Sequence, residues 1–63
     1  MTKTITITVE MNDEQALQFA QFLKRVSFND YRELSTSNEE AHTMIEAGEL
    51  VRKALAEAGY APR

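Results

Sequence analysis

The sequence lacks cysteine and tryptophan altogether and has one proline and two glycines among its 63 residues. Without cysteine it can form neither a disulfide nor a thiolate metal site, which fits a reducing compartment, so we expect a cytoplasmic protein. It also lacks any long apolar run, which argues against a membrane partner. Ten acidic residues against seven basic ones give a net charge of −3, which argues against a chain whose whole surface binds nucleic acid and leaves room for a local basic patch.

The chain is long enough for one small domain, residues 1–63. A domain of this size buries only about 60% of the surface that its unfolded chain exposes, so a disulfide, a metal or a partner chain often completes it. Because the disulfide is excluded, the short length favours a protein that associates with a partner chain.

Catalytic and cofactor-binding motifs are missing as well. The sequence has one histidine, no glycine-rich phosphate loop and no nucleophile beside an evident base, so we predict a non-enzymatic protein with no cofactor. Glu39 and His42 have Glu-x-x-His spacing, which occurs in carboxylate-bridged metal sites. Both fall on the polar side of the predicted helix, which favours a solvated acidic turn and no metal site.

Four elements are predicted. Residues 2–10 alternate between Thr and β-branched apolar residues, which is typical of a strand. Asn12 and Gln15 have capping-box spacing and open a helix over residues 13–26. A short helical turn follows over residues 28–34. A second capping box at Ser37 opens the longest helix, over residues 38–58, where Gly59 provides a Schellman ending.

The single strand predicts how the chain associates. A lone strand has no ladder partner, and an identical antiparallel strand from a second copy is the economical solution. Addition to the sheet of another protein and an unpaired N-terminus are the alternatives. The long helix also carries a heptad seam. The fold class is thus α+β, with the strand paired across a homodimer, and the expected dimerisation residues are Ile5, Ile7, Val9, Met44, Gly48, Val51 and Leu55.

Residues 4–9, as a ribbon, and residues 47–55, as a second helix, resemble the ribbon-helix-helix DNA-binding proteins, which include many antitoxins. The resemblance implies that outward ribbon side chains enter the major groove. Two features depart from the family pattern, namely the dozen residues between the main helices and the acidic start of the second one. The DNA-binding residues implied by the resemblance are Lys3, Thr4, Thr6 and Thr8.

Residues 22–32 and 54–63 are similar to short bacterial proteins of prophage and mobile-element type, among them anti-CRISPR inhibitors. This resemblance rests on size, acidity and general character. It implies a small protein that inhibits a larger nucleic-acid-processing complex by occupying its surface.

Charge is segregated along the chain in a way that suits a protein partner. Residues 24–32 are basic and aromatic, whereas residues 33–49 hold five Glu and no Lys or Arg. Leu50 falls on the polar face of the long helix, where it can anchor an interface, although an ordinary solvated surface explains the same pattern. The expected partner-binding residues are Lys24, Arg25, Tyr31, Arg32, Glu46, Glu49 and Leu50.

These observations favour a small acidic protein-binding module, of the inhibitor type, over a dimeric ribbon-helix-helix regulator or antitoxin. Charge and the long interhelical segment decide the order. The acidic start of the second helix opposes phosphate contacts, and the long segment departs from the short turn of the ribbon-helix-helix family.

Overall fold

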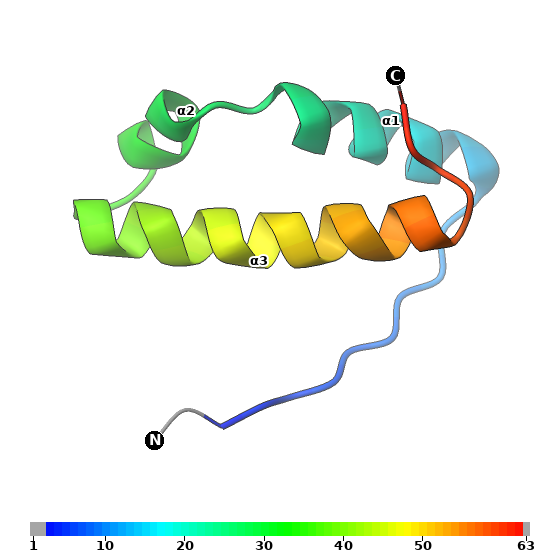
Figure 1. Ribbon diagram of the computed structural model, residues 1–63, viewed down its shortest axis with the longest axis horizontal. Helices are drawn as coiled ribbons and strands as arrows, with labels where there is room; N and C mark the ends of the chain where they lie inside the picture. Colours follow the sequence, from blue (N-terminus) through cyan, green and yellow to red (C-terminus); the bar gives the residue numbers. More distant parts are fainter. Residues whose placement is uncertain (1–2, 63) are drawn as a thin grey trace.

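The computed structural model describes residues 3–62 and consists of three helices joined by short connections (Figure 1). Helix α1 comprises Asp13–Arg25, α2 comprises Phe28–Glu33 and α3 comprises Asn38–Glu57. Figure 1 shows α1 and α2 one after the other along one side of α3, which packs against both. None of these helices is long and apolar enough to cross a membrane.

The predicted strand and the α+β class are wrong. Residues 3–12 are extended but form no strand, and all regular structure within residues 3–62 is helical. Alternation decides the edge on which each side chain lies, but a strand also needs a ladder neighbour, and the described chain offers none. Without a strand, the predicted pairing of that strand across a homodimer is wrong as well. Residue 2, the first of the predicted strand, lies outside the described residues, as do residues 1 and 63.

Local hydrogen bonds fix where α1 and α2 begin. The Asn12 side chain accepts from the Gln15 N–H at 2.7 Å, and the Gln15 side chain accepts from the Asn12 N–H at 3.0 Å, which confirms the predicted capping box. Ser27 and Asp30 form a second reciprocal box at α2. The Ser27 N–H and, secondarily, its hydroxyl hold the pKa of the Asp30 carboxyl below its usual value.

The start of α3 is capped on one side only. The Ser37 hydroxyl accepts from the Glu40 N–H at 3.1 Å, as predicted. The Glu40 carboxylate does not return to Ser37; it accepts instead from the Thr36 hydroxyl at 2.7 Å. The predicted box is therefore half formed, because the Glu40 carboxylate is bonded to Thr36 instead of to the Ser37 N–H.

The end of α3 is a Schellman motif, as predicted. Gly59 has a φ of 104°, in the left-handed region that favours glycine. The Tyr60 N–H donates to the Leu55 carbonyl at 2.8 Å, and the Gly59 N–H donates to the Ala56 carbonyl at 3.0 Å. This turn places the Tyr60 ring against the core and its hydroxyl on the Asp13 carboxylate at the start of α1.

We expect the pKa of Tyr60 to lie above the ordinary tyrosine value of about 10. The cause is the hydrogen bond to Asp13, which stabilises the neutral phenol; desolvation and the Asp13 charge act in the same direction. A folded-state pKa that is raised contributes stability below the unfolded value and loses it as pH rises through the folded value. NMR titration of the tyrosine Cζ resonances measures the shift, and Asp13→Ala should return it toward the ordinary value.

The core is small. Its buried members are Ala16, Ala20 and Leu23 from α1, together with Ala41 and Leu55 from α3. Three of these five are alanine, and α2 contributes no buried residue. Most of the large apolar side chains of the described chain therefore lie partly or wholly outside the core.

Candidate protein-interaction surfaces

Three members of the expected basic-aromatic cluster make contacts within the chain. Arg32 donates from Nε to the Asn38 side chain at 2.7 Å and from Nη1 to the Ser35 carbonyl at 3.2 Å, which holds the turn between α2 and α3. The Lys24 ammonium donates to the Pro62 carbonyl at 3.1 Å. Tyr31 is half-buried, with its hydroxyl over Gly48. These side chains are thus joined to other parts of the same chain and do not form one exposed cluster.

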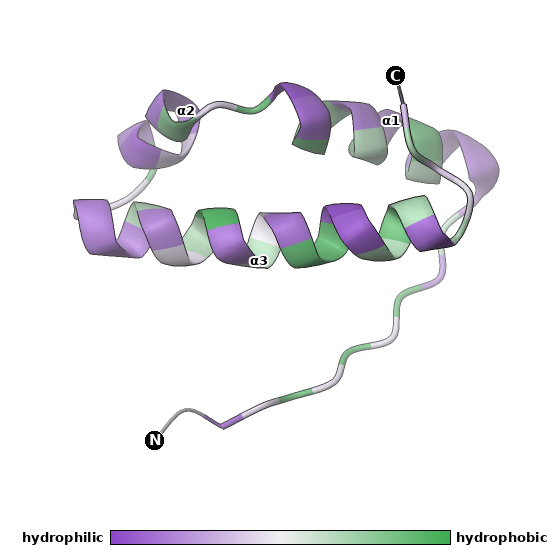
Figure 2. Ribbon diagram, viewed as in Figure 1, coloured by the Kyte–Doolittle hydropathy of each residue, from purple (hydrophilic) through white to green (hydrophobic). Residues whose placement is uncertain are grey.

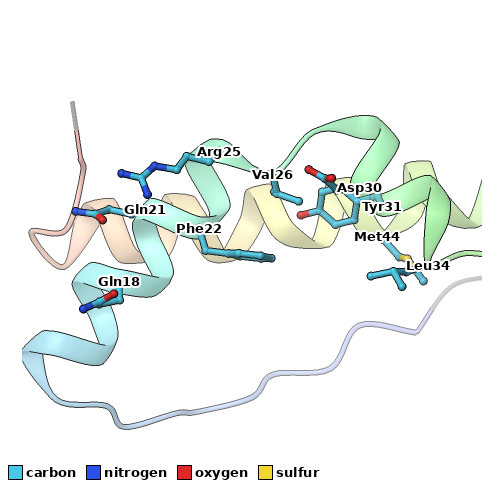
Figure 3. Close-up of a pocket in the computed structure, with 9 residues that line it drawn as sticks. All are labelled: Gln18, Gln21, Phe22, Arg25, Val26, Asp30, Tyr31, Leu34 and Met44. Carbon is cyan, nitrogen blue, oxygen red and sulfur yellow. The ribbon is translucent and has the colours of Figure 1, made fainter.

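Arg25 and Tyr31 do share a feature, a groove of about 660 Å³ between α1 and α2 (Figure 3). Its apolar lining comes from both helices, from Leu34 after α2 and from Met44 on α3. Figure 3 shows Leu34 beside Met44 at the α2 end and Gln18 at the opposite end. The residues that line the groove are Gln18, Gln21, Phe22, Arg25, Val26, Asp30, Tyr31, Leu34 and Met44.

A second, shallower hollow adjoins this groove along α1. It is lined by Gln15, Gln18, Phe19 and Phe22, so it shares Gln18 and Phe22 with the groove. The rings of Phe19 and Phe22 stack with centroids 5.8 Å apart and planes 7° apart. We call the combined surface the α1 shelf; its apolar residues are Phe19, Phe22, Val26, Leu34 and Met44.

The shelf is open to solvent. Phe22 is 55% exposed and Leu34 is 84% exposed. Sequence reasoning did not identify it as a site, although the apolar arc of α1 covers more than half of the helix circumference, and that width was the available signal. One neighbouring helix covers only the side that carries Ala16, Ala20 and Leu23.

The outer face of α3 carries the remaining expected partner-binding residues. Leu50 is 71% exposed there. Ala47 and Ala54 lie three positions before it and four after, so they share its face, while Glu46 and Lys53 flank its other side. We use "outer face of α3" for this surface, which combines a small apolar stripe with a charged border.

Negative charge predominates on helix α3. Helix α3 has five Glu against Arg52 and Lys53, a net charge of −3 that equals the net charge of the whole chain. Glu49 is paired with Arg52 at 2.9 Å, and that hydrogen bond lowers the pKa of the Glu49 carboxyl. Both partners are half-exposed, so the pair contributes little to stability but fixes where the carboxylate lies.

Three of the four expected dimerisation residues of α3 lie on the side that faces α1 and α2. Leu55 is in the core, Gly48 lies against Tyr31 and Leu23, and Met44 lines the groove. Val51 lies at the edge of the outer face. Apart from Val51, which is 37% exposed, the seam thus faces α1 and α2 of the same chain, since the turn after α2 folds them back onto it.

The arm that precedes α1 holds the residues implied for DNA binding. Lys3, Thr4, Thr6 and Thr8 are all exposed. They lie on an extended segment without a paired strand, so the two-stranded ribbon that would carry them into a groove is missing from residues 3–62.

The two residues with metal-site spacing, Glu39 and His42, lie at the surface of α3. Both side chains are exposed, and the His42 ring packs on Phe28 with centroids 5.2 Å apart, joining the start of α2 to α3. Within residues 3–62, no group of three His, Cys, Asp or Glu side chains is placed to hold a metal ion.

Comparison with known proteins places the chain by family alone. No curated protein and no solved structure matches it. One family model matches residues 1–63, the full chain, and its description is a family of unknown function. The chain belongs to that family, DUF7706.

Proposed function

We propose that this protein is a non-enzymatic protein-binding module that presents the outer face of α3 to a basic surface on a larger protein. The observation that carries the proposal is Leu50, a large apolar side chain that is 71% exposed between a stripe of small residues and a charged border. An apolar anchor surrounded by polar groups is the arrangement of an interface hot spot.

Electrostatics favours a basic partner. The excess of negative charge on α3 equals that of the whole chain, and the residues outside α3 carry five acidic and five basic side chains. A helix with excess negative charge steers association with a positive surface and discourages acidic partners. Proteins that bind nucleic acid have such positive surfaces, which makes a nucleic-acid-processing complex the partner class that we propose, with inhibition by occupancy as the consequence.

The ribbon-helix-helix regulator is not proposed. It required a ribbon from the N-terminal segment, and that segment forms no strand within the described residues. The first turn of α3 also carries Glu39 and Glu40. Two carboxylates there repel the phosphate that a helix N-terminus would otherwise attract.

The proposal predicts that Leu50→Lys weakens partner binding about 30-fold, the usual effect of losing a hot-spot residue. The tagged protein is captured from its native host, the bound protein is identified, and the two proteins are titrated against each other. Leu17→Lys is the matched control, because it makes the same change at a half-exposed leucine on α1. It should bind as tightly as the wild type.

The same titration at rising salt tests the electrostatic part. Affinity should fall as salt screens the carboxylates of α3 from a basic partner. Equal binding by Leu50→Lys and wild type would reject the outer face of α3 as the site. Capture of one short DNA sequence without a protein would reject the protein-binding module.

A further inference from the structure

The chain exposes more surface than a compact monomer of its mass. A compact monomer of 7.2 kDa is expected to expose about 4,100 Å², whereas this chain exposes 5590 Å². The radius of gyration, 12.8 Å, likewise exceeds the value of about 10.6 Å expected for 63 compact residues. The excess surface is close to 1,500 Å², on the order of twice the roughly 800 Å² that each partner buries in a stable interface.

Every residue of the N-terminal arm, residues 3–11, is exposed. Its apolar residues Ile5, Ile7 and Val9 are 64–74% exposed and recur at every second position, so one edge of the extended chain is apolar. Figure 2 shows this as green bands along the arm, which Figure 1 shows extending away from the helices. Its main chain makes no hydrogen bond to any other described residue. The arm therefore presents both apolar side chains and free backbone groups.

The α1 shelf is the complementary surface. Ile5 to Val9 spans about 13 Å in an extended chain, and Phe19 to Val26 spans about 10 Å along a helix. Three apolar side chains on the arm thus have a row of similar length, Phe19, Phe22 and Val26, to pack on. Gln18 and Gln21 border that row, and their amides both donate to and accept from an extended backbone.

The arm does not cover the shelf of its own chain. The Asn12 and Gln15 capping box fixes the direction in which the chain enters α1, and the apolar side chains of the arm remain exposed. A second copy can supply the missing arm. A two-fold arrangement would let each copy give its arm and receive one, which covers both surfaces with no third component.

We infer that two copies of this chain associate by exchanging their N-terminal arms, with Ile5, Ile7 and Val9 of one copy packed on the α1 shelf of the other. This contact joins an extended segment to a helix and involves no pairing of strands. It uses α1 and leaves the outer face of α3 free, so it stands or falls independently of the proposed function.

The first test is the oligomeric state of full-length variants, measured by sedimentation equilibrium. The wild type should be a dimer. Ile7→Asp should weaken the dimer at least tenfold, because it places a charge against the Phe22 ring. Thr6→Asp is the matched control, since it places the same charge on the opposite edge of the arm, and it should remain a dimer. A monomeric wild type, or equal behaviour of the two variants, would overturn the inference.

Disulfide cross-linking then tests which surfaces are in contact. Because the chain has no cysteine of its own, only the introduced cysteines can react. Ile7→Cys and Phe22→Cys are purified separately, mixed, allowed to exchange subunits and oxidised. The expected product is a disulfide between one chain of each variant. Ile7→Cys linked chiefly to itself would show arm-to-arm contact and overturn the inference. A chain that carries both substitutions and forms the disulfide within itself, as a monomer, would also overturn the inference.

Discussion

Leu55→Ala is expected to abolish the cooperative unfolding transition of this protein at 25 °C. Leu55 is 8% exposed and packs with Ala16, Ala20 and Leu23, so it is one of only two large side chains in the buried cluster. Truncation of a buried leucine costs about 2–5 kcal/mol, and a core of this size rarely supplies more than about 3–5 kcal/mol. The loss is therefore comparable with the whole stability of the chain.

The helix provides its own control. Leu50→Ala makes the same chemical change five residues earlier, at a side chain that the structure leaves largely in solvent. It should alter the free energy of unfolding by no more than about 0.5 kcal/mol. Urea titration followed by circular dichroism measures both variants at one protein concentration, because a dimer makes apparent stability concentration-dependent. Equal losses for the two variants would contradict the placement of the core.

The helices could be predicted closely because local interactions set them. Asn12, Ser27, Ser37 and Gly59 act on residues within four or five positions, so their roles are readable from spacing alone. Each helix ends one residue before its predicted bound, within the uncertainty of any helix end. The sequence could therefore establish the features of this fold in which the interacting residues lie within about one helical turn of each other.

The strand prediction was wrong because strand pairing is a non-local interaction. Ile5, Ile7 and Val9 do alternate, but pairing depends on a neighbour that lies elsewhere, and alternation contains no information about where that neighbour is. The seam of α3 shows the same limit. Periodicity correctly indicated that Gly48 and Leu55 face a helix, yet it could not say whether that helix belongs to this chain or to another.

The candidate sites also differ in whether a local or a non-local signal defines them. Leu50 could be found from its position opposite Ala41 on a helical wheel, which is a local argument, and the structure leaves it exposed. The α1 shelf could be found only in part, because the wide apolar arc of α1 is a local signal, whereas the place of Leu34 and Met44 in the same groove as Phe22 is not. Those three residues are brought together only by the packing of both short helices against α3.

Gly48→Leu is expected to displace α2 from α3. Helix α2 has no buried residue, and the half-buried Tyr31 is its close contact at Gly48, where even a Cβ would collide with the Tyr31 hydroxyl. Overpacking of this kind costs about 1–3 kcal/mol or more. Ala47→Leu is the control, since it enlarges the exposed neighbouring residue. Urea titration should show a large loss for Gly48→Leu and almost none for Ala47→Leu; equal losses would contradict the contact.

A double-mutant cycle identifies the atom responsible. Gly48→Ala gains about 1 kcal/mol of helix propensity but forces the Tyr31 hydroxyl to move, since the nearest ring carbon is already at 3.4 Å from the added Cβ. Tyr31→Phe removes that hydroxyl and keeps the ring. Gly48→Ala should therefore be more favourable in the Tyr31→Phe background than in the wild type, by a coupling energy of at least about 0.5 kcal/mol, as expected for residues in contact. Additive effects would show that the Tyr31 hydroxyl does not lie over Gly48 in solution.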